Sequence, residues 1–241
     1  MNEPNKQTKL QHLFWRAGFG ASPQQVRAAM EKPLSETIAA LFQDAKTENS
    51  LDAIPSGEPG YNRKAMRELI RRRNELSAEE KKAMVKDVAK ENRGKIGDLN
   101  FQWLDQMGLG AAALREKMTL FWHGHFACRN RVAGFVQQQH NTIRGLALGK
   151  FGDLLRAVSQ DPAMLQFLNN QQNKKDSPNE NFAREVMELF TMGRGAYTEK
   201  DIREAARAFT GWGFIPASGD FVFRKAQHDE GTKTIFGKTG N

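Results

Sequence analysis

The sequence predicts an all-α protein, a multi-helix globular domain that carries a small β-hairpin near its C-terminal end. Apolar residues recur with the 3.6-residue period of a helix along most of the 241 residues. Three residue pairs are typical of helix N-termini: Ser22-Pro23, Ser77 with Glu80, and Thr198 with Asp201. Only the tail differs, because 221–223 and 234–236 have the composition of short strands.

The N-terminal half is expected to form short helices and one charged arm. Residues 49–60 contain two prolines and two glycines and predict a loop. Leu99, Trp103 and Met107 share one helical face. The expected helices are 23–30, 34–42, one that starts near Asn62, one that starts after Ser77, 96–107 and 114–122.

The C-terminal half continues the pattern. Apolar residues from Ile143 to Val158 predict one amphipathic helix. The expected order is a helix starting at Asp161-Pro162, a polar loop at 169–176, a helix capped by Ser177 and Glu180, and a last helix from Thr198 to Gly211. The two strands are expected on either side of a turn at 229–231.

The net charge of +8 is concentrated in one segment. From Arg63 to Lys95 there are twelve Lys or Arg and six Asp or Glu, a net of +6. The segment 62–95 is therefore predicted to be a basic helical arm, with phosphate or an anionic surface as the alternative partner. It contains no aromatic residue and no groove-reading motif, so a sequence-specific nucleic-acid partner is not expected.

Compartment signals are few. No apolar run approaches the roughly 20 residues that span a bilayer, so no transmembrane segment is expected. The polar N-terminus lacks the pattern of a secretory signal. Cys128 is the single cysteine, which excludes an internal disulfide. The sequence as it stands predicts a cytoplasmic protein.

Five ordered blocks carry a family resemblance: RAGFG at 16–20, REKMTLFWHGHF at 115–126, NENFAREVMELFTMG at 179–193, YTEKDIREAARAFTGW at 197–212 and HDEGTKTIFG at 228–237. Together they resemble the bacterial domain-of-unknown-function family numbered 1800. The resemblance implies a mostly helical protein without an established activity.

The resemblance also implies a cellular and genomic context for the chain. Many members are exported, and their genes often lie beside a family with a sulfatase-like fold. Members are usually about twice this length, so the chain resembles an N-terminal half. A protein partner or a missing C-terminal half is therefore expected to contact it, and an uncovered apolar surface would favour self-association.

The segment 178–193 holds the candidate catalytic residues. Arg184, Glu185 and Glu188 fall with Asn181 on one helical face, opposite an apolar face that includes Leu189. The two carboxylates would face a cleft, with Arg184 as a counter-charge or anion clamp. The alternative is a solvated polar face without chemistry.

The stretch TLFWHGHF at 119–126 supplies the candidate metal ligands. In a regular helix His123 and His125 project about 200° apart and cannot share a metal ion. Gly124 permits a helix end or bend that would turn both rings to one side. The predicted ligands are His123, His125, Glu188 and His228, with Glu116, His140 and Asp229 as further donors. The alternative is that both histidines only pack at a helix end.

Two functions therefore remain open from the sequence. One is a metal-assisted hydrolase in which a divalent ion such as zinc, manganese or iron activates water between helices. The other is a non-catalytic helical scaffold or binding module that acts with a partner enzyme.

Overall fold

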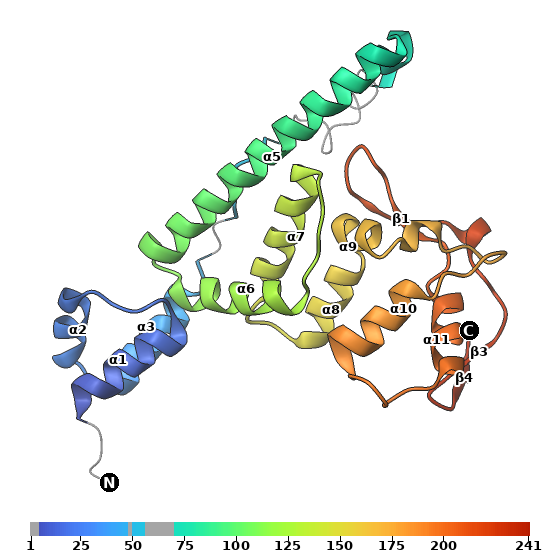
Figure 1. Ribbon diagram of the computed structural model, residues 1–241. Helices are drawn as coiled ribbons and strands as arrows, with labels where there is room; N and C mark the ends of the chain where they lie inside the picture. Colours follow the sequence, from blue (N-terminus) through green and yellow to red (C-terminus); the bar gives the residue numbers. More distant parts are fainter. Residues whose placement is uncertain (1–4, 48–49, 56–69) are drawn as a thin grey trace.

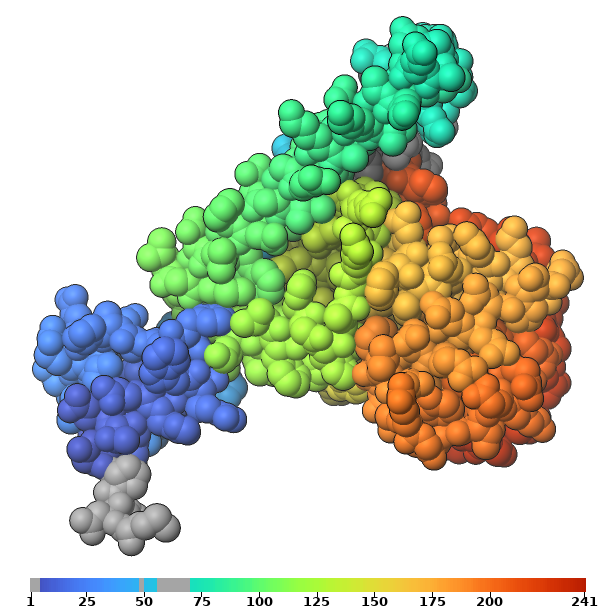
Figure 2. All heavy atoms as spheres, viewed as in Figure 1, coloured from blue at the N-terminus to red at the C-terminus, as the bar shows by residue number. Residues whose placement is uncertain are grey.

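The computed structural model describes residues 5–47, 50–55 and 70–241. Helices dominate it, and short strands occur only near the C-terminus, which confirms the predicted fold class. Helices α1–α3 lie at one end of the molecule, α6 and α7 lie in the middle, and α8–α11 with the strands form the other end (Figure 1). Helix α5 runs diagonally and projects beyond this body (Figure 2). No helix in the described ranges is both long and apolar enough to cross a membrane.

Three helices build the N-terminal end: α1 (Lys6–Ala17), α2 (Pro23–Met30) and α3 (Leu34–Asp44). The predicted cap of α2 is confirmed, since Ser22 and Gln25 form a reciprocal capping box before Pro23. The turn from α1 to α2 needs a left-handed residue, which Gly20 supplies at φ 106°. Its N–H donates to the Phe14 carbonyl at 3.2 Å. This turn packs α2 against α1.

Helix α5 (Ala78–Leu109) is a single helix of 32 residues. Its predicted start is confirmed by a capping box between Ser77 and Glu80. The separate helix expected at 96–107 is instead its last part. Leu99 and Trp103 are buried there against Leu51, which ties this part of α5 to the body. The predicted helix start near residue 62 lies outside the described residues, whereas residues 70–75 are described and are helical.

The middle of the chain forms α6 (Ala113–His125), α7 (Ala133–Leu146), α8 (Phe151–Ser159) and α9 (Pro162–Phe167). The prediction of one helix across 143–158 is wrong. The chain turns between α7 and α8, where the Gly149 N–H donates to the Leu146 carbonyl at 2.9 Å. The apolar residues that suggested one helical face therefore reach the core from two packed helices.

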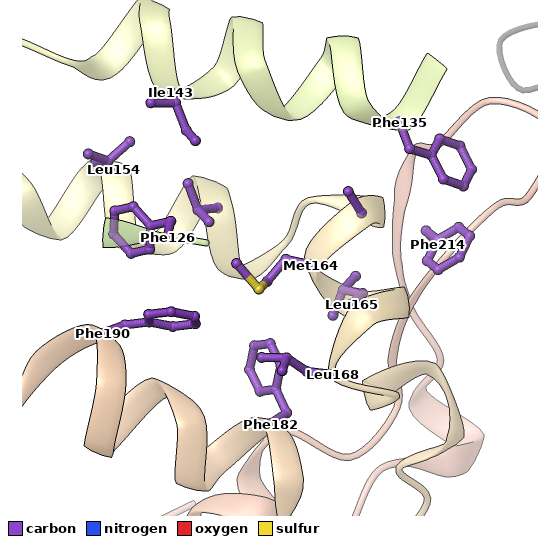
Figure 3. Packing of buried hydrophobic residues seen from close by; sticks show 12 residues of the cluster. Phe126, Phe135, Ile143, Leu154, Met164, Leu165, Leu168, Phe182, Phe190 and Phe214 are labelled. Carbon is purple, nitrogen blue, oxygen red and sulfur yellow. The ribbon is translucent and has the colours of Figure 1, made fainter. Parts of the chain in front are cut away.

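The main core lies between these helices and the C-terminal region. Phe126, Met164 and Phe182 are each at most 1% exposed. Figure 3 shows Ile143 and Leu154 facing Phe126 from one side and Phe190 facing it from the other. Burying such a side chain stabilises the fold by about 1.5–3 kcal/mol. This core fixes the end of α6 against the segment that carries the predicted carboxylates.

That segment forms α10 (Asn181–Glu185) and continues as a π-helix over Val186–Thr191. The predicted Ser177/Glu180 capping box is wrong, because Glu180 is the N-cap without a side-chain bond and pairs with Arg184 instead. The wider π turn also changes the phase of the helix. Leu189, expected on the buried face, is 58% exposed.

Helix α11 (Glu199–Ala208) begins with the predicted Thr198/Asp201 capping box, which confirms that start. Four short strands follow: β1 (Trp212–Phe214), β2 (Phe221–Phe223), β3 (Lys233–Ile235) and β4 (Lys238–Gly240). The two expected strand positions are confirmed, but they do not pair with each other. β1 pairs with β2 and β3 with β4, both antiparallel, so the tail holds two hairpins.

Candidate functional site

The two histidines of α6 face different neighbours. The helix continues through Gly124 and ends at His125, so no break separates them. The His123 ring lies 5.2 Å from the ring of Trp103 on α5. His125 Nε2 lies 3.0 Å from the carbonyl oxygen of Phe190. The shared cleft expected from a bend between the histidines is therefore not formed.

A buried ion pair lies next to Trp103, at the junction of α5, α6 and α7. Glu116 is 1% exposed and Arg144 is 4% exposed. Arg144 Nε donates to Glu116 Oε1 at 2.7 Å, and Trp103 Nε1 donates to Glu116 Oε2 at 3.0 Å. Both carboxylate oxygens are therefore satisfied, which is what a buried charge requires. Glu116 is one of the predicted further donors, but its bonds hold helices together.

His140, on α7, lies at the same junction. Its ring centroid is 4.3 Å from that of Trp103 in an edge-to-face arrangement, and the residue is 4% exposed. Neither ring nitrogen has a hydrogen-bond partner among the described residues. Burial lowers the pKa of His140 to about 3, with a further contribution from the nearby charges of His123 and Arg144. The imidazole is therefore neutral at pH 7.

The predicted catalytic residues are tied into surface ion pairs. Arg184 donates to both carboxylate oxygens of Glu199 at 2.8 Å, and so links α10 to α11. Glu188 accepts from Arg194 Nε at 2.5 Å and from Tyr197 Oη at 2.9 Å. These bonds, that from Arg194 first, lower the pKa of Glu188. Glu185 is half-buried on the same segment, without an ion pair to another described residue.

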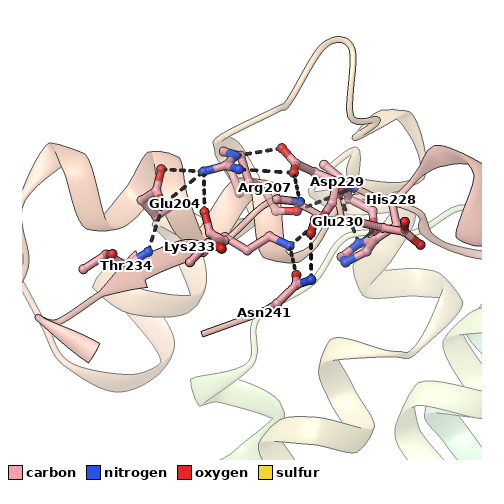
Figure 4. Close-up of polar contacts among 12 residues, drawn as sticks. Glu204, Arg207, His228, Asp229, Glu230, Lys233, Thr234 and Asn241 are labelled. Atoms are coloured by element: carbon pink, nitrogen blue, oxygen red, sulfur yellow. Dashed lines mark hydrogen bonds and ion pairs between the residues drawn. The ribbon is translucent and has the colours of Figure 1, made fainter. Parts of the chain in front are cut away.

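His228 and Asp229 belong to a clamp between α11 and the last hairpin (Figure 4). His228 Nδ1 lies 2.8 Å from the Thr210 carbonyl oxygen. Arg207 donates to both oxygens of Asp229, at 2.7 and 3.2 Å, and also binds Glu204. Arg207 is the main cause that lowers the pKa of Asp229 to about 2. The clamp therefore gives His228 and Asp229, from the HDEGTKTIFG block at 228–237, a structural role.

The predicted metal ligands do not come together in this structure. Across residues 5–47, 50–55 and 70–241, no three His, Cys, Asp or Glu side chains form a group that could hold a metal ion. His123, His125 and His228 contact three different sets of neighbours. Glu188 is bonded to a fourth set of neighbours, Arg194 and Tyr197.

A surface groove between α1 and α2 offers a different candidate site. Its volume is about 690 Å³. It is lined from α1 by Gln7, Thr8, Gln11, His12 and Trp15, and from the second helix and the turn before it by Ala21, Pro23, Val26, Arg27 and Met30. The α1 positions repeat at helical spacing and span about 12 Å. Volumes of roughly 300–1,000 Å³ are typical of ligand sites.

Trp15 is the central feature of this site. Its side chain is 64% exposed, and it also borders a second hollow of about 380 Å³ with Arg16, Lys117, Met118 and Phe121. Phe121, from the TLFWHGHF stretch, is 58% exposed. Trp15 lines both hollows, and Phe121 lines the second, so the two hollows adjoin at the Trp15 side chain. We call this region the Trp15 surface, defined by the residues that line the two hollows.

The residues of this surface are not among the sequence candidates, because those were chosen as metal ligands or catalytic groups. A signal was nevertheless present. Gln7, Gln11 and Trp15 recur every four residues, which puts a tryptophan on an otherwise polar helical face. No Asp or Glu occurs between Glu3 and Glu31, a stretch that holds four Lys or Arg.

The fold and these sites define a mostly helical protein in which ion pairs such as Glu116–Arg144 and Arg184–Glu199 link helices, and in which the described part of the N-terminal helices forms a groove. The chain belongs to the family described as "Protein of unknown function (DUF1800)", whose model matches residues 12–241. The family resemblance of the five blocks is thereby confirmed. No curated protein and no solved structure gives a significant match.

Proposed function

We propose that the chain is a helical binding module that acts through protein–protein contact at the Trp15 surface. The observation that carries this proposal is the exposure of Trp15 and Phe121 around two adjoining hollows. Exposed aromatic residues that gather rather than scatter are typical of interaction sites. Tryptophan is also among the residues that contribute most to binding at protein interfaces.

The surrounding charge suits a partner that is recruited from solution. Arg16 and Lys117 border the hollow beside Phe121, and the Lys117 ammonium lies 5.0 Å from the ring centre of Phe19. An aromatic centre with a cationic rim matches the anatomy of reversible interfaces. The buried Glu116–Arg144 pair supports the proposal indirectly, since it fixes α6, which carries Phe121, to α7.

A metal-assisted hydrolase is the second candidate. The observation that favours it is His140, a buried imidazole with two unbonded nitrogens whose ring contacts Trp103, as the ring of His123 also does. A catalytic zinc site uses three protein ligands. The described residues bring two imidazoles to Trp103, so a third ligand would have to be supplied from elsewhere.

One experiment separates the two candidates. Protein prepared without a histidine tag is assayed for bound zinc, manganese and iron and for ester and phosphoester hydrolysis, alongside His123→Ala, His140→Ala and Glu188→Ala. The binding module predicts substoichiometric metal and no hydrolysis that depends on these residues. One metal ion per chain, lost together with hydrolysis in His123→Ala and His140→Ala, would establish the hydrolase instead.

A further inference from the structure

We infer that the groove between α1 and α2 binds an acidic, leucine-rich segment of a partner protein. This inference rests on the proposed function and names the chemistry of its partner. The first observation is electrostatic. Residues 5–30 contain Lys6, Lys9, Arg16 and Arg27 and no carboxylate, a net of +4. A surface of one sign attracts and orients a partner of the opposite sign.

Arg27 provides the specific anchor for a carboxylate. It lines the groove and makes no ion pair with another described residue. Its planar guanidinium can donate two parallel hydrogen bonds to a single carboxylate. By contrast, Arg184 and Arg207 are already bonded to carboxylates of their own chain. An incoming Asp or Glu would therefore meet an unoccupied donor at Arg27.

The apolar part of the groove explains why the segment also needs leucine. Trp15 and Met30 are 64% and 40% exposed, while Val26 forms a floor that is 8% exposed. Apolar side chains at alternate positions of a bound segment would cover these atoms. Gln7 and Gln11 line the same groove along α1 and offer amide donors and acceptors to a peptide backbone.

The shape favours a polypeptide over other anions. Most residues that line the groove are exposed, whereas small-molecule sites enclose most of their ligand. Single-stranded nucleic acid binds to rows of aromatic rings and to several cations along its backbone. The groove has one tryptophan, no phenylalanine or tyrosine, and one guanidinium in its lining. A segment that lies along two helices fits this geometry.

The test uses fluorescence anisotropy with the whole chain. The probe is a short labelled peptide in which Glu and Asp alternate with Leu. Matched peptides replace the acids by Gln and Asn, or the leucines by Ser. Single-stranded DNA and anionic lipid vesicles complete the set. The acidic, leucine-rich peptide should bind with a Kd on the order of micromolar, and binding should weaken as salt rises.

Variants locate the binding. Trp15→Ala should weaken binding about tenfold, and Arg27→Gln roughly twofold to fivefold. Lys238→Gln, which removes one positive charge from exposed β4, is the matched control and should bind as the wild type does. Because Trp15 and Arg27 are exposed, both variants should retain the wild-type circular dichroism spectrum.

Three results would overturn the inference. One is equal affinity for the uncharged peptide. Another is an equal loss of affinity in Lys238→Gln. The third is tighter binding of DNA or vesicles than of the acidic peptide. A natural partner whose binding is weakened by Trp15→Ala but not by Arg27→Gln would leave the proposed function standing but would contradict the acidic segment anchored at Arg27.

Discussion

Glu116 joins three elements through one carboxylate, since Trp103 comes from α5 and Arg144 from α7. We predict that Glu116→Gln lowers the free energy of unfolding by about 3 kcal/mol, because it leaves the guanidinium of Arg144 buried without a counter-charge. Urea unfolding measures the loss. The matched control is Glu230→Gln. Glu230 Oε1 lies 3.7 Å from Nζ of Lys225, whose side chain is 81% exposed, so this substitution should change stability by less than about 1 kcal/mol. Equal effects of the two substitutions would contradict this role of Glu116.

His140 should make stability depend on pH. Its pKa falls from an ordinary value near 6.5 to about 3 in the folded chain. Between these values the unfolded chain binds a proton that the folded chain does not, so acid favours unfolding. This contribution is fully present above pH 6.5 and is lost as pH falls toward 3. We predict that the free energy of unfolding of His140→Phe falls less steeply as pH decreases, by up to about 1.4 kcal/mol per pH unit. Identical pH profiles for the two proteins would refute the prediction.

At the residue scale, the sequence predicted which side chains are unusual but not what they contact. Glu116 and His140 were named as candidate donors, and both are buried at one junction. Their partners Trp103 and Arg144 are 13 and 28 residues from Glu116. Such contacts depend on how helices pack, and local periodicity does not contain that information.

At the scale of elements, the N-terminus of α9 contains a second pH-sensitive group with the opposite sign. Asp161 caps α9 by accepting from the Ala163 N–H at 2.9 Å, and burial raises its pKa from 3.8 to about 7. The folded chain therefore retains a proton that the unfolded chain has lost. Stability from this group is present below pH 3.8 and is lost as pH rises through 7.

We predict that Asp161→Asn is stabilising and that its advantage grows from about pH 5 to about pH 8, reaching a few kcal/mol. Asn caps helices as well as Asp does, so the cap is preserved. Thermal unfolding at the two pH values measures the change. Asp153→Asn, at an exposed position of α8, provides the control and should show no such growth. A variant whose advantage shrinks with pH would reverse the sign and contradict the account.

The clamp between α11 and the β3–β4 hairpin gives a further prediction. Arg207→Ala should raise the pKa of Asp229 from about 2 toward 3.8, because the main cause of the lowered value is removed. Amide hydrogen exchange should accelerate in β3 and β4 but not in the main core. Arg203→Ala, an exposed position on the same helix, is the matched control. Unchanged exchange in the hairpin would show that Arg207 does not hold it.

Helix starts were predictable where a side chain bonds to the backbone next to it. The caps at Ser22, Ser77 and Thr198 depend on residues three positions apart. The cap predicted at Ser177 does not form, and Ser177 instead makes an isolated β-bridge with Lys174. The turn between α7 and α8 and the π-helix after Glu185 depend on packing against the core, and the local pattern did not indicate either.

At the scale of the whole molecule, charged and aromatic residues separate by role. Arg184 and Glu188, which the sequence suggested as catalytic residues, are bonded within the chain, and so is Arg207. The Trp15 surface instead presents aromatic rings to solvent at the end opposite the hairpins (Figure 1). Its composition was visible in the sequence. Its shape was not, because α1, α2 and α6 must pack together to form it.

The central claim is that the chain acts by binding a partner at the Trp15 surface. Photocrosslinking tests it most directly, with a benzophenone side chain placed at Gln11 in the groove or at exposed Lys200 on α11, in cells that make the protein. We predict that Gln11 crosslinks to a segment rich in Asp and Glu from one protein, that Trp15→Ala abolishes this crosslink, and that Lys200 yields none. Crosslinks of equal yield from both positions, or none from Gln11, would contradict the claim.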